Sequence, residues 1–165
     1  MTPMHGAPTL AFMLRHPAHC IALGFGSGLP RQAPGTFGSL AALLAFNLIA
    51  PHAGDAALLA GLAVAFLVGC WACAVTGHAL GRPDHGGMVW DEIVAFMLVL
   101  VFVPRDLLSQ GLAFFAFRMF DIFKPPPIRH FDRLLKSGFG VMFDDLIAAF
   151  YTLLVFAIAR HFGLW

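Results

Sequence analysis

Residues 56–75 read AALLAGLAVAFLVGCWACAV, an uninterrupted run of twenty residues without a charged side chain. As an α-helix, a run of this length extends about 30 Å, which is roughly the thickness of the hydrocarbon core of a bilayer. It is the longest run of this kind in the chain. We therefore predict a membrane-spanning helix here.

The overall composition supports the same class of protein. The chain has 165 residues, of which 59% are hydrophobic and 12% charged, and its mean hydropathy is +0.81. An ordinary soluble domain is roughly 25% charged. We expect a flexible N-terminal lead over residues 1–20 and a single membrane domain over residues 21–165. The net charge of +1 argues against a nucleic-acid partner, which would need a concentrated basic face.

Four further apolar segments are separated from this run by proline, glycine and charged residues. They cover residues 36–50, 93–103, 107–117 and 146–159. Several are shorter than the roughly 20 residues of a usual membrane span, and the second and third read as a tight hairpin. We predict an all-α fold, a compact bundle of membrane-spanning and interfacial helices.

The charged residues indicate an orientation if the five segments alternate across the bilayer. Eight basic residues then fall on one side: Arg15, Arg31, Arg82, Arg118, Lys124, Arg129, Arg133 and Lys136. Only Arg105 and Arg160 fall on the other. By the positive-inside rule, the crowded side is predicted to face the cytoplasm.

Seven of the nine acidic residues follow the basic ones to that predicted face. They are Asp84, Asp91, Glu92, Asp121, Asp132, Asp144 and Asp145. Charge beside hydrocarbon is expensive and usually marks function. Carboxylates from several segments suit Mg²⁺, and Arg118 and Lys124 are suited to phosphate oxygens. The pattern favours an active site for a phospholipid head group on one membrane face.

Each of these groups also has a structural interpretation. Asp144 and Asp145, expected to open the last helix, could merely complement its amino end. Arg118 and Asp121 could form an ordinary ion pair on a helix surface. Asp91 and Glu92 could simply be solvated. The gathering of all three groups on one face of a chain with few charges favours the functional interpretation.

The segment PGTFGS at residues 34–39 enters the first apolar arm. Thr36 or Ser39 could cap that helix. Alternatively, backbone donors and hydroxyls of this segment could contact a phosphate.

Four motifs carry a resemblance to a known family: PGTFGS at 34–39, DEIV at 91–94, FRMFDIFKP at 117–125, and GFGVMFDD at 138–145. In this order they resemble the phosphatidylglycerophosphatase A family, over about residues 20–160. The resemblance implies a Mg²⁺-dependent, all-helical lipid phosphatase of the bacterial inner membrane. Such enzymes remove the terminal phosphate of phosphatidylglycerophosphate to give phosphatidylglycerol.

By position, the resemblance implies a set of acidic candidates: Asp84, Asp91, Glu92, Asp121, Asp144 and Asp145. It implies Arg118 and Lys124 as phosphate-side candidates, to which we add Thr36 and Ser39. Asp84, Asp91, Glu92, Asp121 and Asp145 are the proposed Mg²⁺ ligands, and Asp91, Asp121, Asp144 and Asp145 the proposed catalytic residues. The chain departs from the family pattern at His85, Ala95, Ser137 and Ala149, which affects local packing more than the reaction.

The expected reaction is hydrolysis of a phosphomonoester by an activated water, with Asp121 or Asp144 as the base. Direct attack by an aspartate is the alternative mechanism. A membrane ion transporter, or a non-catalytic assembly subunit that binds ions, is the alternative function. A transporter would be expected to place paired carboxylates near mid-membrane, whereas here they are predicted at segment ends.

Overall fold

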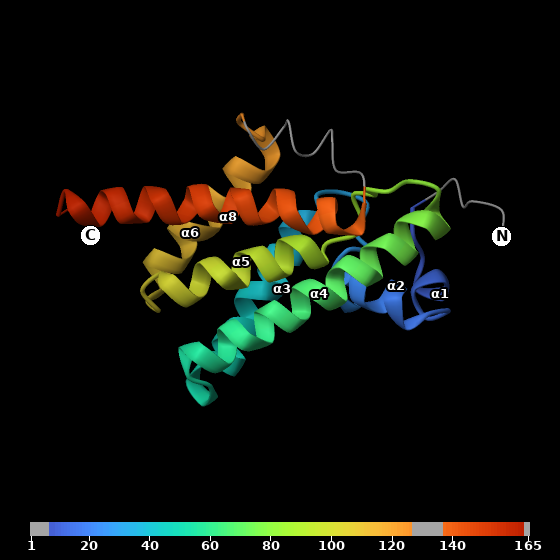
Figure 1. Cartoon of the computed structure of the whole chain (residues 1–165), viewed down its shortest axis with the longest axis horizontal. Helices are drawn as coiled ribbons and strands as arrows, with labels where there is room; N and C mark the ends of the chain where they lie inside the picture. The colour runs from blue at the N-terminus through green and yellow to red at the C-terminus, as the bar shows by residue number, and fades with distance from the viewer. Residues whose placement is uncertain (1–6, 127–136, 164–165) are drawn as a thin grey trace.

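The computed structural model describes residues 7–126 and 137–163, and all regular structure within these ranges is helical (Figure 1). The predicted all-α fold is confirmed. The elements are α1 (Leu10–Met13), α2 (Pro17–Ala22), η1 (Gly24–Gly26), α3 (Pro34–Ile49), η2 (Ala50–His52), α4 (Asp55–Leu80), α5 (Trp90–Phe102), α6 (Leu107–Phe123) and α8 (Gly138–His161).

Three helical segments of the described ranges are long and apolar enough to cross a membrane. They are Pro34–His52, Asp55–Leu80 and Gly138–His161. The second contains the charge-free run at residues 56–75 and extends beyond it until Gly81, whose left-handed φ of 69° ends the helix. Three helices of this kind indicate a membrane protein.

The last helix begins earlier than expected. The Ser137 side chain accepts a hydrogen bond from the backbone N–H of Gly140 at 3.2 Å and so caps α8 at its amino end. Asp144 and Asp145 consequently lie about two turns inside the helix. The expectation that this acidic pair opens the helix was wrong, because the glycine-containing segment before it is itself helical.

Contacts at the two ends of the bundle show that α3, α4, α5 and α6 alternate in direction. At one end Arg105, between α5 and α6, lies 2.8 Å from the Asp55 carboxylate and donates to the Ala50 carbonyl at 3.3 Å. The end of α3, the start of α4 and the α5–α6 connection therefore meet there. At the opposite end, Gly35 of α3 lies against Glu92 of α5 and Arg118 of α6.

With this alternation, Arg31, Arg82, Arg118 and Lys124 lie near the end of the bundle that holds Glu92, and Arg105 lies near the other end. Asp132, Arg129, Arg133 and Lys136, which entered the orientation argument, lie outside the described residues.

The short helix α5 occupies the centre of the bundle and contacts α3, α4, α6 and α8. Phe96 and Val99 are fully buried, and the Phe96 ring stacks on Phe117 of α6 with centroids 5.3 Å apart. A helix of 13 residues is marginal alone, so its position depends on the longer helices around it.

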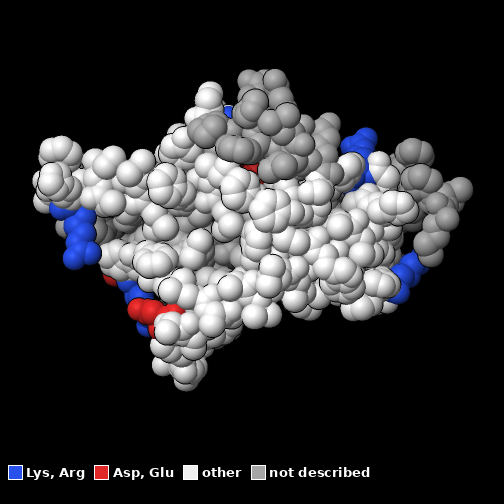
Figure 2. Space-filling view, in the orientation of Figure 1, with Lys and Arg blue, Asp and Glu red and all other residues white. Residues whose placement is uncertain are grey.

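Small side chains fill many contacts between helices, and many large apolar side chains lie exposed on the outside of the bundle. Ala42, Ala72 and Ala148 are fully buried, whereas Leu67 and Phe115 are well exposed. Small residues at helix contacts and large apolar residues on the outer surface are typical of helices that pack closely within lipid. Figure 2 shows a broad surface without charged side chains across the middle of one face.

The N-terminal helices α1 and α2 pack against the site-end half of α4. Ala18 and Ala22 are fully buried, and the ring Nδ1 of His19 lies 2.9 Å from the Thr76 hydroxyl. Part of the segment expected as a flexible lead is thus helical and partly buried. The reason is that its apolar side chains, including Phe12, find a packing surface.

We predict that the Asn47 and Gln110 side chains hold α3 against α6. Each amide donates to the other, at 2.9 and 3.1 Å. Asn47→Ala leaves the buried Gln110 amide without this partner and should lower the free energy of unfolding in detergent by about 1 kcal/mol. Asn47→Leu combined with Gln110→Leu should recover part of the loss, and a double variant less stable than Asn47→Ala would contradict this.

Candidate metal and phosphate site

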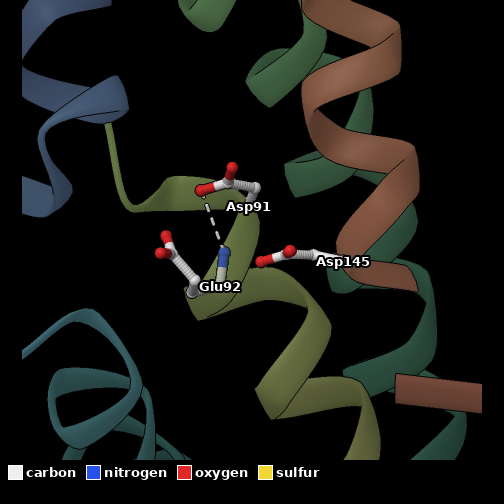
Figure 3. Close-up of side chains that lie close together, drawn as sticks. All are labelled: Asp91, Glu92 and Asp145. Carbon is white, nitrogen blue, oxygen red and sulfur yellow. Dashed lines mark hydrogen bonds between the residues drawn. The ribbon is translucent and has the colours of Figure 1, made fainter. Parts of the chain in front are cut away.

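Three carboxylates from two helices converge at one end of the bundle. Asp91 and Glu92 lie in the first turn of α5, and Asp145 points toward them from α8 (Figure 3). Each offers one oxygen, and these oxygens all lie within 4.8 Å of one another. Asp91 is 7% exposed and Asp145 3% exposed. Such a group of buried oxygens can hold a metal ion.

Contacts with residues that come earlier in the sequence hold the start of α5 in place. The backbone N–H of Val89 donates to the Ala22 carbonyl at 2.8 Å, and the Trp90 indole N–H donates to the Ala65 carbonyl of α4 at 3.0 Å. A Cβ at Gly69 would clash with Trp90 and with Met142 of α8. Gly69 therefore lets α5 and α8 approach α4 at the level of the acidic group.

Burial dominates the electrostatics of the two acids in α5, which is not among the three candidate spans. It raises the pKa of Glu92 to about 8, with the negative charge of Asp145 adding to the effect. It also raises the pKa of Asp91 well above its usual range, with Glu92 as the next contributor. The group therefore needs either protons or a cation to be stable.

Two unpaired oxygens of the group indicate that the site can bind a cation. Glu92 Oε2 and Asp145 Oδ2 are buried without a hydrogen-bond partner. Buried polar atoms are normally satisfied, and an all-oxygen donor set suits a hard divalent cation. The residues present therefore fit a metal ion of that kind.

Asp121 pairs with Arg118 and does not belong to the three-carboxylate group. Arg118 Nη1 approaches Asp121 Oδ2 at 2.5 Å, without hydrogen-bond alignment, and Glu92 Oε1 at 3.7 Å. The Arg118 side chain is 13% exposed, and its Nε has no hydrogen-bond partner. The guanidinium thus stands beside the acidic group with donor capacity to spare.

Lys124 pairs with Asp144 across the gap between α6 and α8. Lys124 ends α6 in a left-handed conformation, with φ of 41°, and its Nζ lies 2.5 Å from Asp144 Oδ2. The other oxygen of Asp144 accepts the backbone N–H of Asp145 at 3.1 Å. This pair places a cation next to the acid that adjoins Asp145.

The other predicted site residues occupy different positions. Asp84 is exposed and lies outside the three-carboxylate group. Thr36 is half-buried in the first turn of α3, and the buried Ser39 hydroxyl donates to the Gly35 carbonyl at 3.0 Å. Neither caps the helix, because its N-cap is Ala33, which has φ of 48° and no side-chain cap. The expected capping role was therefore wrong.

Sequence reasoning missed Gly35. A Cβ at this position would collide with Glu92 Oε1 and would lie 2.8 Å from Arg118 Nη1. Only a glycine allows the first turn of α3 to pack directly on the acid and the guanidinium. The Pro-Gly pair at a helix start was the available signal, but its partner residues could not be inferred from it.

The fold and the site define a helical membrane protein with a buried acidic site able to hold a metal ion. Residues 20–160 match the family described as phosphatidylglycerophosphatase A, and the chain belongs to that family, which makes it a phosphatase.

Curated relatives agree with this assignment. A phosphatidylglycerophosphatase A of Haemophilus influenzae is 46% identical over 92% of this chain and 94% of its own length. The Escherichia coli protein of the same name is 35% identical over 92% of this chain and 88% of its own length. A Bacteroides thetaiotaomicron protein, named provisionally as a phosphatidylinositol-3-phosphatase, is 37% identical over 85% of this chain and 91% of its own. No solved structure matches the chain.

We predict that Gly35→Ala disrupts the site. The added methyl group must displace Glu92 or Arg118, so divalent-cation affinity, measured by calorimetry in detergent, should fall about tenfold or more. Gly111→Ala in α6 is the matched control, because a Cβ there meets nothing within 4 Å. Equal cation affinity of the two variants would show that the contact of α3 with the site is unimportant.

We also predict a pH dependence of stability in the presence of a chelator. Because the folded-state pKa values of Asp91 and Glu92 are raised, the folded protein keeps protons that the unfolded chain has released. Stability should therefore fall as pH rises from about 5 to about 8, by about 1.4 kcal/mol for each unit of pKa shift. Thermal unfolding in detergent measures this.

A divalent cation should reduce that fall, since it replaces the protons. The combined change Asp91→Asn and Glu92→Gln should flatten the profile, whereas Asp55→Asn at the opposite end should leave it in place. A transition temperature that rises over this pH range in chelator would show that these carboxyls are not protonated in the folded state.

Proposed function

We propose that the protein hydrolyses the terminal phosphomonoester of phosphatidylglycerophosphate to phosphatidylglycerol and phosphate, with Mg²⁺ as cofactor. The observation that carries this proposal is the convergence of Asp91, Glu92 and Asp145 beside Arg118. Membership of the phosphatidylglycerophosphatase A family supports the substrate, as do the names of the two relatives that share it.

In this proposal Asp91, Glu92 and Asp145 hold the Mg²⁺ ion. Asp121 and Asp84 remain further candidate ligands of the metal ion. Asp121 lies next to Arg118, and Asp84 is exposed. When bound, the cation would neutralise charge on the phosphoryl group and lower the pKa of a water molecule.

The phosphate is proposed to bind between Arg118, Lys124 and the first turn of α3. Asp121 holds the Arg118 guanidinium in place, and a planar fork of donors suits phosphate oxygens. The half-buried Thr36 hydroxyl is the candidate contact from α3. Ser39 supports that turn through its hydrogen bond to Gly35, and is the weaker candidate for direct contact.

The proposed step is attack of water on phosphorus, with cleavage of the bond to the glycerol oxygen. The water loses a proton to a carboxylate, which passes a proton on to the departing alkoxide to give the hydroxyl of phosphatidylglycerol. Asp121 and Asp144 are the candidate bases, because each lies beside a proposed phosphate-binding cation, Arg118 or Lys124.

Attack by an aspartate is the second mechanism consistent with the geometry. Asp145 Oδ2 is buried without a hydrogen-bond partner. Its attack on phosphorus would break the bond to the glycerol oxygen, release phosphatidylglycerol and leave an acyl phosphate that water then hydrolyses. Trapping of a phosphorylated enzyme with hydroxylamine would favour this route over direct attack by water.

We propose that the site faces the cytoplasm at a bacterial inner membrane. Described basic residues at the site end of the bundle are Arg15, Arg31, Arg82, Arg118 and Lys124, against Arg105 and Arg160 at the other end. This bias supports the positive-inside orientation. The bilayer itself is the proposed partner of the uncharged surface.

We predict that the detergent-purified protein releases phosphate from phosphatidylglycerophosphate only when Mg²⁺ is present. Asp91→Asn should lower kcat/KM about 100-fold or more, because it removes charge that stabilises the bound cation and the transition state. Asp55→Asn is the matched control at the opposite end, where the ion pair with Arg105 is exposed, and it should retain activity. Phosphate release is measured colorimetrically on each folded variant.

Other outcomes would point to other functions. Turnover of a phosphatidylinositol phosphate in place of phosphatidylglycerophosphate would keep the phosphatase and change its substrate. Absence of turnover of any lipid phosphate with Mg²⁺, in several detergents, would favour the transporter or assembly alternatives. Unchanged activity of Asp91→Asn would remove Asp91 from the proposed metal site.

A further inference from the structure

A hollow of about 370 Å³ lies between α4, α5 and α8, three helices that pack side by side (Figure 1). Its walls are apolar and include Leu59, Ala63, Leu67, Val94, Leu98 and Leu146. We refer to it as the α4–α5–α8 groove. Ala63 and Leu67 are exposed on the outside of the bundle, so the groove opens toward the surrounding lipid.

The groove begins close to the acidic site along two helices. In α5, Asp91, Val94 and Leu98 are spaced three and four residues apart and therefore share one side of the helix. Along the helix axis Val94 and Leu98 lie about 4.5 and about 10.5 Å from Asp91. In α8, Leu146 directly follows Asp145. The groove thus begins within one turn of the site carboxylates and leads toward the interior of the membrane.

The groove also runs along α4 in the same direction. From Leu67 to Leu59 it follows the helix for about 12 Å, away from Gly69, where α4 packs against Trp90 and Met142 at the level of the acidic group. Its course is that of a chain extending from the membrane surface into the hydrocarbon core.

We propose that the α4–α5–α8 groove receives one acyl chain of the phosphorylated lipid while its head group occupies the acidic site. The inference rests on the proposed function, because a lipid substrate must have a phosphate at the carboxylates and its chains in the hydrocarbon. Chain binding beside the site positions the phosphate and makes chain length a determinant of kcat/KM.

A second hollow, at the other end of the bundle, is an alternative binding site for a lipid chain. A hollow of about 630 Å³ is lined by Phe102, Pro104, Phe156 and Arg160. It lies at the carboxyl ends of α5 and α8, far from the three carboxylates along both helices. Its size alone would favour it as a lipid site, so an experiment must distinguish the two.

The first test compares dioleoyl with dihexanoyl phosphatidylglycerophosphate in mixed micelles at constant surface concentration. The wild-type chain should have the higher kcat/KM for the long-chain lipid. Ala63→Phe fills the groove and should lower the long-chain to short-chain ratio about tenfold, as changes of pocket volume do. Ala57→Phe is the matched control, since Ala57 is exposed on the same helix and is not part of the groove lining.

An unchanged ratio in folded Ala63→Phe would overturn the groove and leave the proposed function intact. A loss of the ratio in Ala57→Phe as well would also overturn it, because the effect would then be general to α4.

The second test does not depend on turnover or on a variant. A phosphatidylglycerophosphate analogue with a mid-chain diazirine is photolysed with the wild-type protein, and labelled peptides are identified by mass spectrometry. The groove predicts labelling within residues 59–67 or 94–98, competed by unlabelled long-chain substrate. Labelling concentrated near Phe102 and Phe156, or spread evenly over outward faces such as those at Leu44 and Leu154, would overturn it.

The two tests separate the inference from the function beneath it. If the wild-type chain releases no phosphate from either lipid, the proposed function fails, and the labelling pattern alone decides whether the groove binds a lipid chain.

Discussion

The structure depends on placing Asp91, Glu92 and Asp145 together in a buried site. Removing a carboxylate from water costs several kcal/mol unless charge or hydrogen bonds compensate. Three of them within 4.8 Å add mutual repulsion to that cost. The packing of α5 and α8 against α4 holds them there, and the folded state must then bind protons or a cation.

The surrounding charges are arranged so that the two nearby cations do not remove the need for a metal ion. Arg118 is closest to Asp121, and Lys124 is held by Asp144. Each of these cations thus forms an ion pair with an acid outside the three-carboxylate group. In the proposed function, this separation would let one set of acids orient the phosphate-binding cations and leave the other set for a divalent ion.

Much of this arrangement follows from the sequence because it depends on composition and on short-range geometry. The length of the charge-free run predicts α4, and Pro125 after Lys124 predicts the end of α6. Two apolar segments, 93–103 and 107–117, lie between Glu92 and Asp145 in the sequence. If each crosses the bilayer once, the chain returns to the same side, so Asp91, Glu92 and Asp145 were expected at one end. The family resemblance and the comparisons with known proteins agree.

Other features depend on the angles and rotations at which helices pack against one another, and these cannot be inferred from a single sequence. The contact of Gly35 with Glu92 depends on the angle between α3 and α5. The spacing of Arg118 and Asp121 allowed their ion pair to be named from the sequence, but the position of Asp121 outside the three-carboxylate group depends on the rotation of α6. The helical start of α8 at Gly138 was obscured by two glycines, whose low helix propensity is overridden by capping and close packing on α4.

The site and the groove together describe how a membrane bundle could act on a lipid without withdrawing it from the bilayer. The polar group would meet α3, α5, α6 and α8 at one membrane face, and one chain would stay between α4, α5 and α8. The short length of α5 matters here, because its first turn carries the acids and its next turns line the groove.

Anomalous diffraction from crystals grown with Mn²⁺, a substitute for Mg²⁺ at oxygen sites, addresses the buried acids directly. The account predicts an anomalous peak in contact with carboxylate oxygens of Asp91, Glu92 and Asp145. A protein that is active with Mn²⁺ but holds the ion away from these three side chains, for example at Asp84 alone, would contradict it.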